Sequence, residues 1–451
     1  MNKYNKLREI YKTFEYTAYE IVKLQDEIKL TYFFRIPGLA EFKPQWTLKK
    51  TDVDIENRTF EEMVFNLGMV ELISYWKIAC PKEVIIKAGH LDEWQKAWWK
   101  DQYYNGLGEF FYTNNIELDP YGFMNITSVG KELKGDRKPL DKGNKVLIPV
   151  GGGKDSVVTL EIAKSAEFER EAYIINPRGA TINTAMAAGI SNPIVAGRTL
   201  DKEMLRLNSE GYLNGHTPFS AIVAFSSLIA AYLNKASYIA LSNESSANES
   251  TVKGSSVNHQ YSKSFKFEKD FGEYERRYIG TNILYFSMLR PLSEFQIAAL
   301  FAHYPQYHGI FRSCNAGSRQ DIWCGHCPKC LFVFIILSPF LFHDEVVNIF
   351  GRDMLDDGEM KEDFYKLIGI EDEKPFECVG SRDEINTALV LTVDKMENMG
   401  MELPLLLKCY KNTGLYESYK KSGINYFNYY DRENLLPERF EKALKDKLEE
   451  L

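Results

Sequence analysis

Three glycines followed by a lysine, an aspartate and a serine, at residues 151–156, form the stretch of this sequence best suited to chemistry. An apolar run at 146–150 precedes them and predicts a short buried strand, and a helical pattern follows at 157–163. A strand, a glycine loop and the start of a helix together attract phosphate, because free backbone N–H groups and the helix dipole both favour an anion there. The sequence therefore predicts a phosphate-binding loop.

The side chains of this loop add the groups that a nucleotide site needs. Lys154 supplies a cation for a leaving phosphate, Ser156 a hydroxyl donor, and Asp155 a carboxylate suited to Mg²⁺. We assign catalytic roles to Lys154 and Asp155. The residues expected to bind the nucleotide here are Gly151, Gly152, Gly153, Lys154 and Ser156.

The spacing differs from both the Walker A loop, G-x-x-x-x-G-K-[ST], and the dinucleotide pattern G-x-G-x-x-G. It resembles the S-G-G-x-D-S loop of the N-type ATP pyrophosphatases, which split ATP into AMP and pyrophosphate while adenylating a substrate. Gly152, Gly153, Asp155 and Ser156 match that loop, and Gly151 stands where a serine is usual. The resemblance implies that the loop binds ATP and that Asp155 binds Mg²⁺. The alternative is a glycine-rich turn without a ligand.

Four cysteines between residues 314 and 330 have the spacing of a metal site, since three of them follow one another at intervals of two residues. Four thiolates suit tetrahedral Zn²⁺, and closed sites of this kind are structural. We expect Zn²⁺ on Cys314, Cys324, Cys327 and Cys330, with an iron–sulfur cluster or a metal-free cluster as the alternatives. His326 is not expected to be a ligand, because four cysteines already complete the coordination.

Polar residues follow later strands, at the edge where an open parallel sheet binds its ligands. The strand expected at 238–241 runs into a polar turn, which we place at the nucleotide; the alternative is a solvated loop. The ATP-binding candidates in this turn are Ser242, Asn243 and Glu244. Lys263 and Arg290 are the candidates for contact with an anionic substrate.

Three side chains are candidates for moving a proton, because a thiol or an imidazole can be tuned close to neutral pH. They are Cys378, His216 and His259. The simpler alternatives are packing for an isolated cysteine in a loop and helix capping for a histidine that precedes a helix.

The elements that must position these residues alternate after the glycine loop. Short apolar runs that predict strands are followed by helical patterns, the longest of them at 219–233. Such alternation predicts an α/β fold with a doubly wound parallel sheet. The loop's resemblance implies the N-type ATP pyrophosphatase version of it, which is adenine nucleotide alpha hydrolase-like.

The residues before the loop predict a separate α+β region. Helical periodicity at 7–28 and 90–104, a strand at 30–36 and an apolar helix from Phe60 support this. The tryptophans at 94, 98 and 99 are expected in the core. We expect an N-terminal α+β domain at 1–140, an ATP pyrophosphatase domain at 141–310, a four-cysteine zinc element at 311–345 and a helical C-terminal region at 346–451.

The composition indicates a globular protein of two or three domains. The chain has 451 residues, 45% hydrophobic and 26% charged, with a formal net charge of −8. Nucleic acid is an unexpected partner for an acidic chain without a basic stripe. The sequence has no signal-peptide core and no run of about 18 apolar residues, so we expect a cytoplasmic protein without a membrane segment.

Two families resemble this combination. Residues 145–335, with the pyrophosphate loop and W-C-G-H-C-P-K-C, are similar to 7-cyano-7-deazaguanine synthase, which pairs such a loop with a zinc-binding cysteine cluster. Over about 60 to 390 the chain resembles the MurL family of UDP-N-acetylmuramoyl-L-alanyl-L-glutamate epimerases. The motifs that carry this second resemblance are N-L-G-M-V-E-L-I-S-Y-W-K at 66–77, N-G-H-T-P-F-S-A at 214–221, L-S-N-E-S-S-A-N at 241–248, L-R-P-L-S-E at 289–294 and K-P-F-E-C-V-G at 374–380.

The MurL resemblance implies an ATP- and Mg²⁺-dependent isomerase of peptidoglycan synthesis, a step of cell wall biogenesis that supports cell shape. Its substrate would be the UDP-linked muramoyl dipeptide, whose terminal L-glutamate becomes D-glutamate through an acyl-adenylate, with release of AMP and pyrophosphate. The alternative is an ATP-dependent nucleobase or tRNA modifying enzyme related to the synthase. A non-catalytic nucleotide-sensing module is disfavoured by the intact Lys-Asp-Ser run at 154–156. The sequence predicts no oligomeric state.

Overall fold

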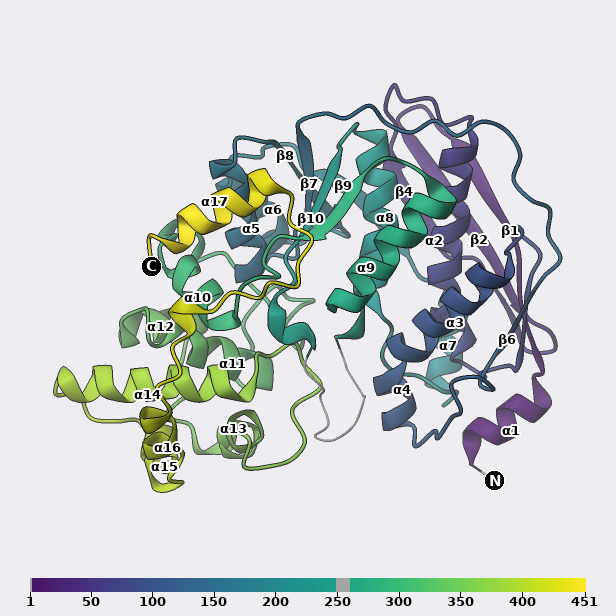
Figure 1. Cartoon of the computed structure of the whole chain (residues 1–451). Coiled ribbons are helices and arrows are strands. Elements are labelled where there is room, and N and C mark those ends of the chain that lie inside the picture. Colours follow the sequence, from purple (N-terminus) through teal and green to yellow (C-terminus); the bar gives the residue numbers. More distant parts are fainter. Residues whose placement is uncertain (1, 249–259) are drawn as a thin grey trace.

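The computed structural model describes residues 2–248 and 260–451, in which helices cover a single mixed sheet (Figure 1). The strands are β1 (Thr13–Lys23), β2 (Glu27–Ile36), β3 (Ala40–Phe42), β4 (Gln45–Lys49), β5 (Glu83–Ile86), β6 (Asn125–Ser128), β7 (Lys145–Pro149), β8 (Glu169–Ile175), β9 (Ile194–Thr199), β10 (Tyr238–Leu241) and β11 (Leu284–Ser287).

The α-helices fall into two groups along the chain. Those before residue 310 are α1 (Lys3–Ile10), α2 (Arg58–Trp76), α3 (Glu93–Gly106), α4 (Gly108–Thr113), α5 (Lys154–Ser165), α6 (Gly179–Ala187), α7 (Lys202–Ser209), α8 (Phe219–Leu233), α9 (Phe265–Tyr274) and α10 (Glu294–Ala302). Those of the C-terminal part are α11 (Pro328–Leu337), α12 (His343–Phe350), α13 (Lys361–Ile368), α14 (Arg382–Asn398), α15 (Leu405–Asn412), α16 (Leu415–Ser422) and α17 (Glu438–Leu448).

The part of the sheet that follows residue 140 is parallel, in the order β11-β10-β7-β8-β9. From β7 the chain adds two strands on one side and then two on the other, so the direction of winding reverses between β7 and β10. In open α/β sheets ligands bind at this reversal, beyond the carboxyl ends of the strands. The prediction of an α/β fold with a doubly wound parallel sheet is confirmed in this arrangement.

The preceding residues extend the same sheet. β4 pairs with β9 in antiparallel fashion, and β2 and β1 follow, with β5 and β6 parallel at the far edge. The boundary expected at residue 140 therefore lies within one continuous sheet of eleven described strands.

Side chains of the parallel strands alternate between two hydrophobic cores, as the pleat requires. Leu147 and Tyr173 point into the core that contains α2 and α8, whereas Val146, Ile148 and Ile174 point into the core that contains α5 and α10. Burial on both faces explains why β7 reads as a continuous apolar run in the sequence. The C-terminal helices extend the second core, in which the Phe440 ring of α17 stacks on the Phe168 ring at 4.0 Å.

Helix α2 runs through the middle of the N-terminal half and is buried almost along its whole length (Figure 1). Trp98 and Trp99 of α3 are buried beside it, as expected, whereas Trp94 is only partly buried against the same core. The Trp98 ring lies 4.3 Å from the Tyr274 ring. Gly68 lets α2 approach the sheet, since a Cβ there would lie 2.1 Å from the Tyr16 hydroxyl oxygen.

The helix expected at 7–28 is wrong. α1 ends at Ile10, and residues Thr13–Lys23 form β1. This segment is rich in β-branched and aromatic residues, and pairing with both β2 and β5 outweighs the local helical spacing. Among the described residues, no helix is both long enough and apolar enough to cross a membrane.

Gly68→Ala should destabilise the protein, whereas Gly272→Ala in α9 should not. The new methyl group at 68 would overlap Tyr16 and Tyr32, which costs about 1–3 kcal/mol of unfolding free energy. A Cβ at Gly272 meets nothing within 4 Å, so the higher helix propensity of alanine should raise the unfolding free energy by up to about 1 kcal/mol. Thermal melting of both variants tests this; a Gly68→Ala protein that melts at or above the wild-type temperature would contradict the close packing of α2.

Candidate active site and metal centre

The glycine loop connects β7 to α5 at the reversal point of the sheet. Gly152 has a φ of +83°, and a Cβ there would lie 3.1 Å from Ala180, so both conformation and space require glycine. A Cβ on Gly151 would meet nothing within 4 Å, which leaves room for the serine that is usual in the related loops. Gly153 caps α5 without a side-chain acceptor for the first N–H groups of the helix. Those groups remain suited to an anion, while the Ser156 hydroxyl donates to the Gly153 carbonyl at 2.9 Å.

Lys154 is buried and forms ion pairs with the carboxylates of Asp155 and Glu294. Burial alone would lower the pKa of Lys154, but the two carboxylates outweigh it and raise this pKa well above its ordinary value. Burial also raises the pKa of Glu294 to about 7, against the opposing effect of the Lys154 charge. Sequence reasoning missed Glu294, although it belongs to the L-R-P-L-S-E motif.

Asp155 is the more accessible of the two carboxylates, with 29% of its side chain exposed. Burial would raise the pKa of Asp155, but the Lys154 and Lys329 ammonium groups lower it overall. An ionised, partly exposed carboxylate beside an anion site is suited to hold Mg²⁺.

The polar turn after β10 lies next to β7 in the sheet. The Ser242 hydroxyl is buried and has no hydrogen-bond partner among the described residues. Asn243 donates to the Ser287 hydroxyl at 3.0 Å, and Glu244 is buried. The structure thus places the predicted turn at the reversal point, with Asn243 engaged by the neighbouring strand.

The side chain of Arg290 is bonded to other parts of the chain. Its side chain is fully buried, pairs with Glu268 at 3.1 Å, and donates to the Glu244 carbonyl at 2.6 Å. It also donates to the Lys263 carbonyl. Arg290 therefore supports the turn after β10 and the Lys263 segment, and its contact with the substrate stays a prediction.

Two lysines link Cys378 to the glycine loop, since the charges of both also act on Asp155. The Lys263 ammonium lies 3.3 Å from the Cys378 sulfur, and Lys329 donates to the Cys378 carbonyl. Burial would lower the pKa of Lys263, but Cys378, Glu244 and Asp155 raise it, so the ammonium persists. Lys329 is a residue that sequence reasoning missed, although it stands within the cysteine cluster.

His216 lies in the segment that leads into α8. Its Nδ1 atom is 3.1 Å from a Glu109 carboxylate oxygen, and both side chains are partly exposed. Lys77 donates to the His216 carbonyl at 3.1 Å and to the Thr217 hydroxyl, which fixes the segment. His259, the third candidate, lies outside the described residues.

A cavity of about 410 Å³ opens beside the glycine loop, between the ends of β7 and β8 and the start of α8. Its wall includes Phe219 and three arginines that sequence reasoning did not single out, Arg178, Arg198 and Arg319. Arg178 donates to the Gly151 carbonyl at 3.3 Å, and Arg198 pairs with the fully buried Glu71 at 2.6 Å. The Asn-Pro-Arg-Gly run after β8 was the available signal. Glu71 compensates the charge of Arg198, so the positive charge of the wall comes from Arg178 and Arg319, which suits an anionic ligand.

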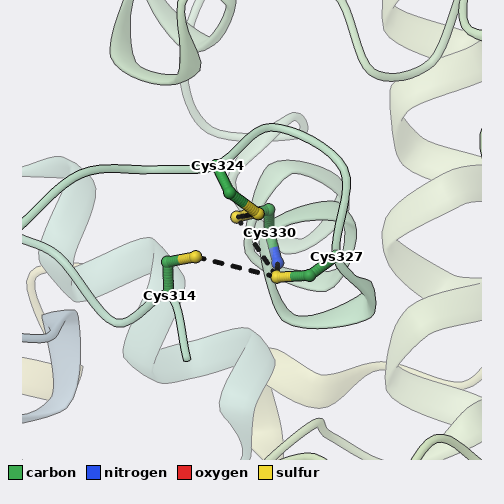
Figure 2. A group of neighbouring side chains, drawn as sticks. All are labelled: Cys314, Cys324, Cys327 and Cys330. Carbon is green, nitrogen blue, oxygen red and sulfur yellow. Dashed lines mark hydrogen bonds between the residues drawn. The ribbon is translucent and has the colours of Figure 1, made fainter. Parts of the chain in front are cut away.

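The four cysteines converge from two segments onto one point (Figure 2). The sulfur atoms of Cys314 and Cys327 are 3.8 Å apart, those of Cys324 and Cys330 3.7 Å, and those of Cys327 and Cys330 3.5 Å. A metal ion with four thiolates at about 2.3 Å requires sulfur separations near 3.8 Å, whereas a multi-iron cluster spreads its thiolates more widely. The group therefore fits a single tetrahedral ion.

The cysteine cluster is joined to the glycine loop. The Arg312 N–H donates to the Gly152 carbonyl at 2.7 Å, two residues before Cys314. Lys329, between two cluster cysteines, holds the Cys378 carbonyl. An ion bound by the cysteines would therefore brace both the phosphate loop and the Cys378 segment.

Comparisons with known proteins show the family of this chain. The family model of the MurL N-terminal domain matches residues 5–288, and that of the MurL C-terminal domain matches 310–411. The chain belongs to the MurL family. A UDP-N-acetyl-alpha-D-muramoyl-L-alanyl-L-glutamate epimerase of Xanthomonas oryzae pv. oryzae is 36% identical over 340 residues, and one of a Micromonospora species is 35% identical over 339 residues. Each alignment covers 73% of this chain and 74% of the MurL relative.

Cys327→Ser should lower the melting temperature and the bound metal together, because a structural ion contributes folding energy directly. Cys409→Ser is the matched control, since Cys409 is a free cysteine outside the cluster. Metal analysis of the purified proteins and thermal melting give the two readouts. Equal melting of Cys327→Ser and wild type, with no metal in either, would contradict a metal centre.

Proposed function

We propose that this chain catalyses the ATP- and Mg²⁺-dependent epimerisation of the terminal L-glutamate of UDP-N-acetylmuramoyl-L-alanyl-L-glutamate. The observation that carries the proposal is the glycine loop, with Lys154 and Asp155, at the reversal point of the sheet, where the Lys263 ammonium interacts with both Asp155 and Cys378. The names of the MurL relatives support the choice of substrate. The strand order supports an N-type ATP pyrophosphatase core.

Activation of the carboxylate explains why an epimerase would consume ATP. Removal of a proton next to an ionised carboxylate would place a second negative charge beside the first. Attack of the carboxylate on the α-phosphorus of ATP releases pyrophosphate and leaves a mixed anhydride, whose enolate carries a single new charge. A modest side-chain base can then exchange the Cα proton. Water finally attacks the acyl carbon, and AMP leaves.

Each part of the site has a role in this scheme. The glycine loop and the start of α5 hold the β- and γ-phosphates, and Lys154 offsets the charge of the departing pyrophosphate. Asp155 binds Mg²⁺. The cavity with Arg178 and Arg198 receives the nucleoside and its α-phosphate, and Ser242 meets the nucleotide from the other side of the reversal point. Cys378 and His216 are the described candidates for proton exchange.

The cysteine centre has a structural role in this proposal. Four thiolates and the sulfur separations favour Zn²⁺, and the bonds from Arg312 and Lys329 carry its bracing effect to the site. We place the reaction in the cytoplasm, because none of the seven cysteines, all of them described, forms a disulfide.

Asp155→Asn should reduce AMP and pyrophosphate formation by at least about 100-fold, because the amide holds Mg²⁺ poorly. Asp446→Asn, in the exposed part of α17, is the matched control. The assay contains ATP, Mg²⁺ and the UDP-linked muramoyl L-Ala-L-Glu substrate, and both nucleotide products and D-glutamate are measured. ADP as the product of the wild-type protein would exclude the proposal, and AMP formation with a nucleobase acceptor alone would favour a modifying enzyme.

Substitutions of the two neighbouring glycines, Gly151 and Gly152, should have different effects on AMP formation. Gly151→Ser should keep AMP formation, because the position is open and a serine is usual there. Gly152→Ser should abolish it, because a Cβ at φ +83° is strained and meets Ala180. Equal activity of the two variants would show that the loop does not bind the phosphates.

A further inference from the structure

The two described candidates for proton transfer come from different halves of the chain, and each has a charged partner. The Cys378 sulfur lies 3.3 Å from the Lys263 ammonium, and Cys378 precedes α14 in the chain. The His216 Nδ1 atom lies 3.1 Å from a Glu109 carboxylate oxygen, and His216 precedes α8 in the chain. Neither partnership is visible in the sequence.

Helix α4 brings the two pairs toward one another. It carries Glu109, and one turn later Tyr112, whose hydroxyl donates to Glu373 at 2.8 Å. The Tyr112 ring also lies 5.5 Å from the ring of Phe376, two residues before Cys378. The segment that carries Cys378 therefore packs on the short helix that carries the partner of His216.

We propose that the epimerisation uses two opposed groups, Cys378 activated by Lys263 and His216 oriented by Glu109, on the two faces of the glutamate α-carbon. The inference rests on the proposed function above and names the groups that perform its stereochemical step. Two-base inversion uses a proton acceptor on one face of the carbon and a donor on the other, and the packing of the Cys378 segment on α4, which carries the partner of His216, supports that arrangement.

The partners supply the protonation states that the step needs. An ammonium beside a sulfur favours the thiolate over the thiol. A carboxylate at Nδ1 fixes the imidazole tautomer and stabilises the imidazolium, so the Nε2 atom, on the opposite side of the ring, exchanges the proton. Lys77 fixes the backbone of His216 through its carbonyl.

The step balances in protons and electrons. One group removes the proton from Cα of the acyl-adenylate, and the electron pair of that C–H bond moves into the enolate. The group on the other face then gives its own proton to Cα, and the enolate returns to the carbonyl. The acceptor gains one proton, the donor loses one, and exchange with water restores both.

The test uses the full chain with ATP, Mg²⁺ and the L-glutamyl substrate in D₂O. The wild-type protein should place deuterium at Cα of the D product and little in the recovered L substrate. Cys378→Ala and His216→Asn should both keep AMP formation and lose D-glutamate formation by at least about 100-fold. One of them should return undeuterated L substrate, because the proton is never removed. The other should return deuterated L substrate, because the proton is removed but no donor serves the opposite face.

Other outcomes overturn the assignment. Formation of D-glutamate at the wild-type rate in either variant would exclude that residue, and the same deuterium pattern in both would exclude groups on two faces. Absence of AMP with wild-type protein would contradict the proposed function itself, which is a separate result. Cys409→Ala and His343→Asn are the controls and should behave as wild type. His343 is matched to His216 because it also has a carboxylate partner, Asp353 at 2.9 Å, and Cys409 is a free cysteine.

The positioning roles have their own readouts. Lys263→Met should slow alkylation of Cys378 by iodoacetamide about tenfold, and Lys263→Arg should restore most of the rate, because only the charge favours the thiolate. Glu109→Gln should reproduce the deuterium pattern of His216→Asn, with an unchanged melting temperature. Unaltered alkylation in Lys263→Met, or unaltered exchange in Glu109→Gln, would remove the corresponding partner from the mechanism.

Discussion

The buried ammonium of Lys154 is the charge on which the rest of the site depends. A cation out of contact with water costs several kcal/mol unless it is paired, and its two carboxylates come from different elements. Asp155 is the next residue of α5, whereas Glu294 begins α10. The Glu294 N–H donates to a Glu384 carboxylate oxygen at 2.6 Å. Burial and the charge of Glu294 raise the pKa of Glu384 to about 6. One charge therefore ties α5, α10 and α14 together behind the phosphate loop.

The continuous sheet carries a second constraint, because it places the N-terminal half beside the same loop. The β4–β9 pairing runs from Gln45 opposite Thr199 to Leu48 opposite Ala196. It brings the fully buried Glu71 of α2 within 2.6 Å of Arg198 on β9, at the wall of the cavity. The N-terminal half is thus part of the site rather than an appendage, and through α4 it also reaches the Cys378 segment.

The cysteine cluster completes the frame from the other side. Residues just before and within it bond to the Gly152 and Cys378 carbonyls. These bonds hold two segments that are far apart in sequence, and neither belongs to a regular element that could fix it alone. An ion bound by the four thiolates would rigidify both segments, since such an ion sets the geometry of its ligands.

The sequence by itself determined what local spacing encodes. The glycine loop, the four cysteines and the alternation after residue 140 each depend on neighbours within a few residues, so a glycine turn between a strand and a helix, a cluster of four cysteines and an α/β sheet were predictable. Membership of the MurL family, inferred from five motifs, is confirmed by both domain models. Only the tertiary structure decided which distant charges meet. It showed that Arg290 supports the segments around it and that Glu294 pairs with Lys154. It also showed that residues Thr13–Lys23 form a strand where the local period indicated a helix. It also paired Lys263 with Cys378 and Glu109 with His216. The physical reason is that pairing, burial and charge compensation depend on distances in space, and those are set by how the sheet orders its strands rather than by spacing along the chain.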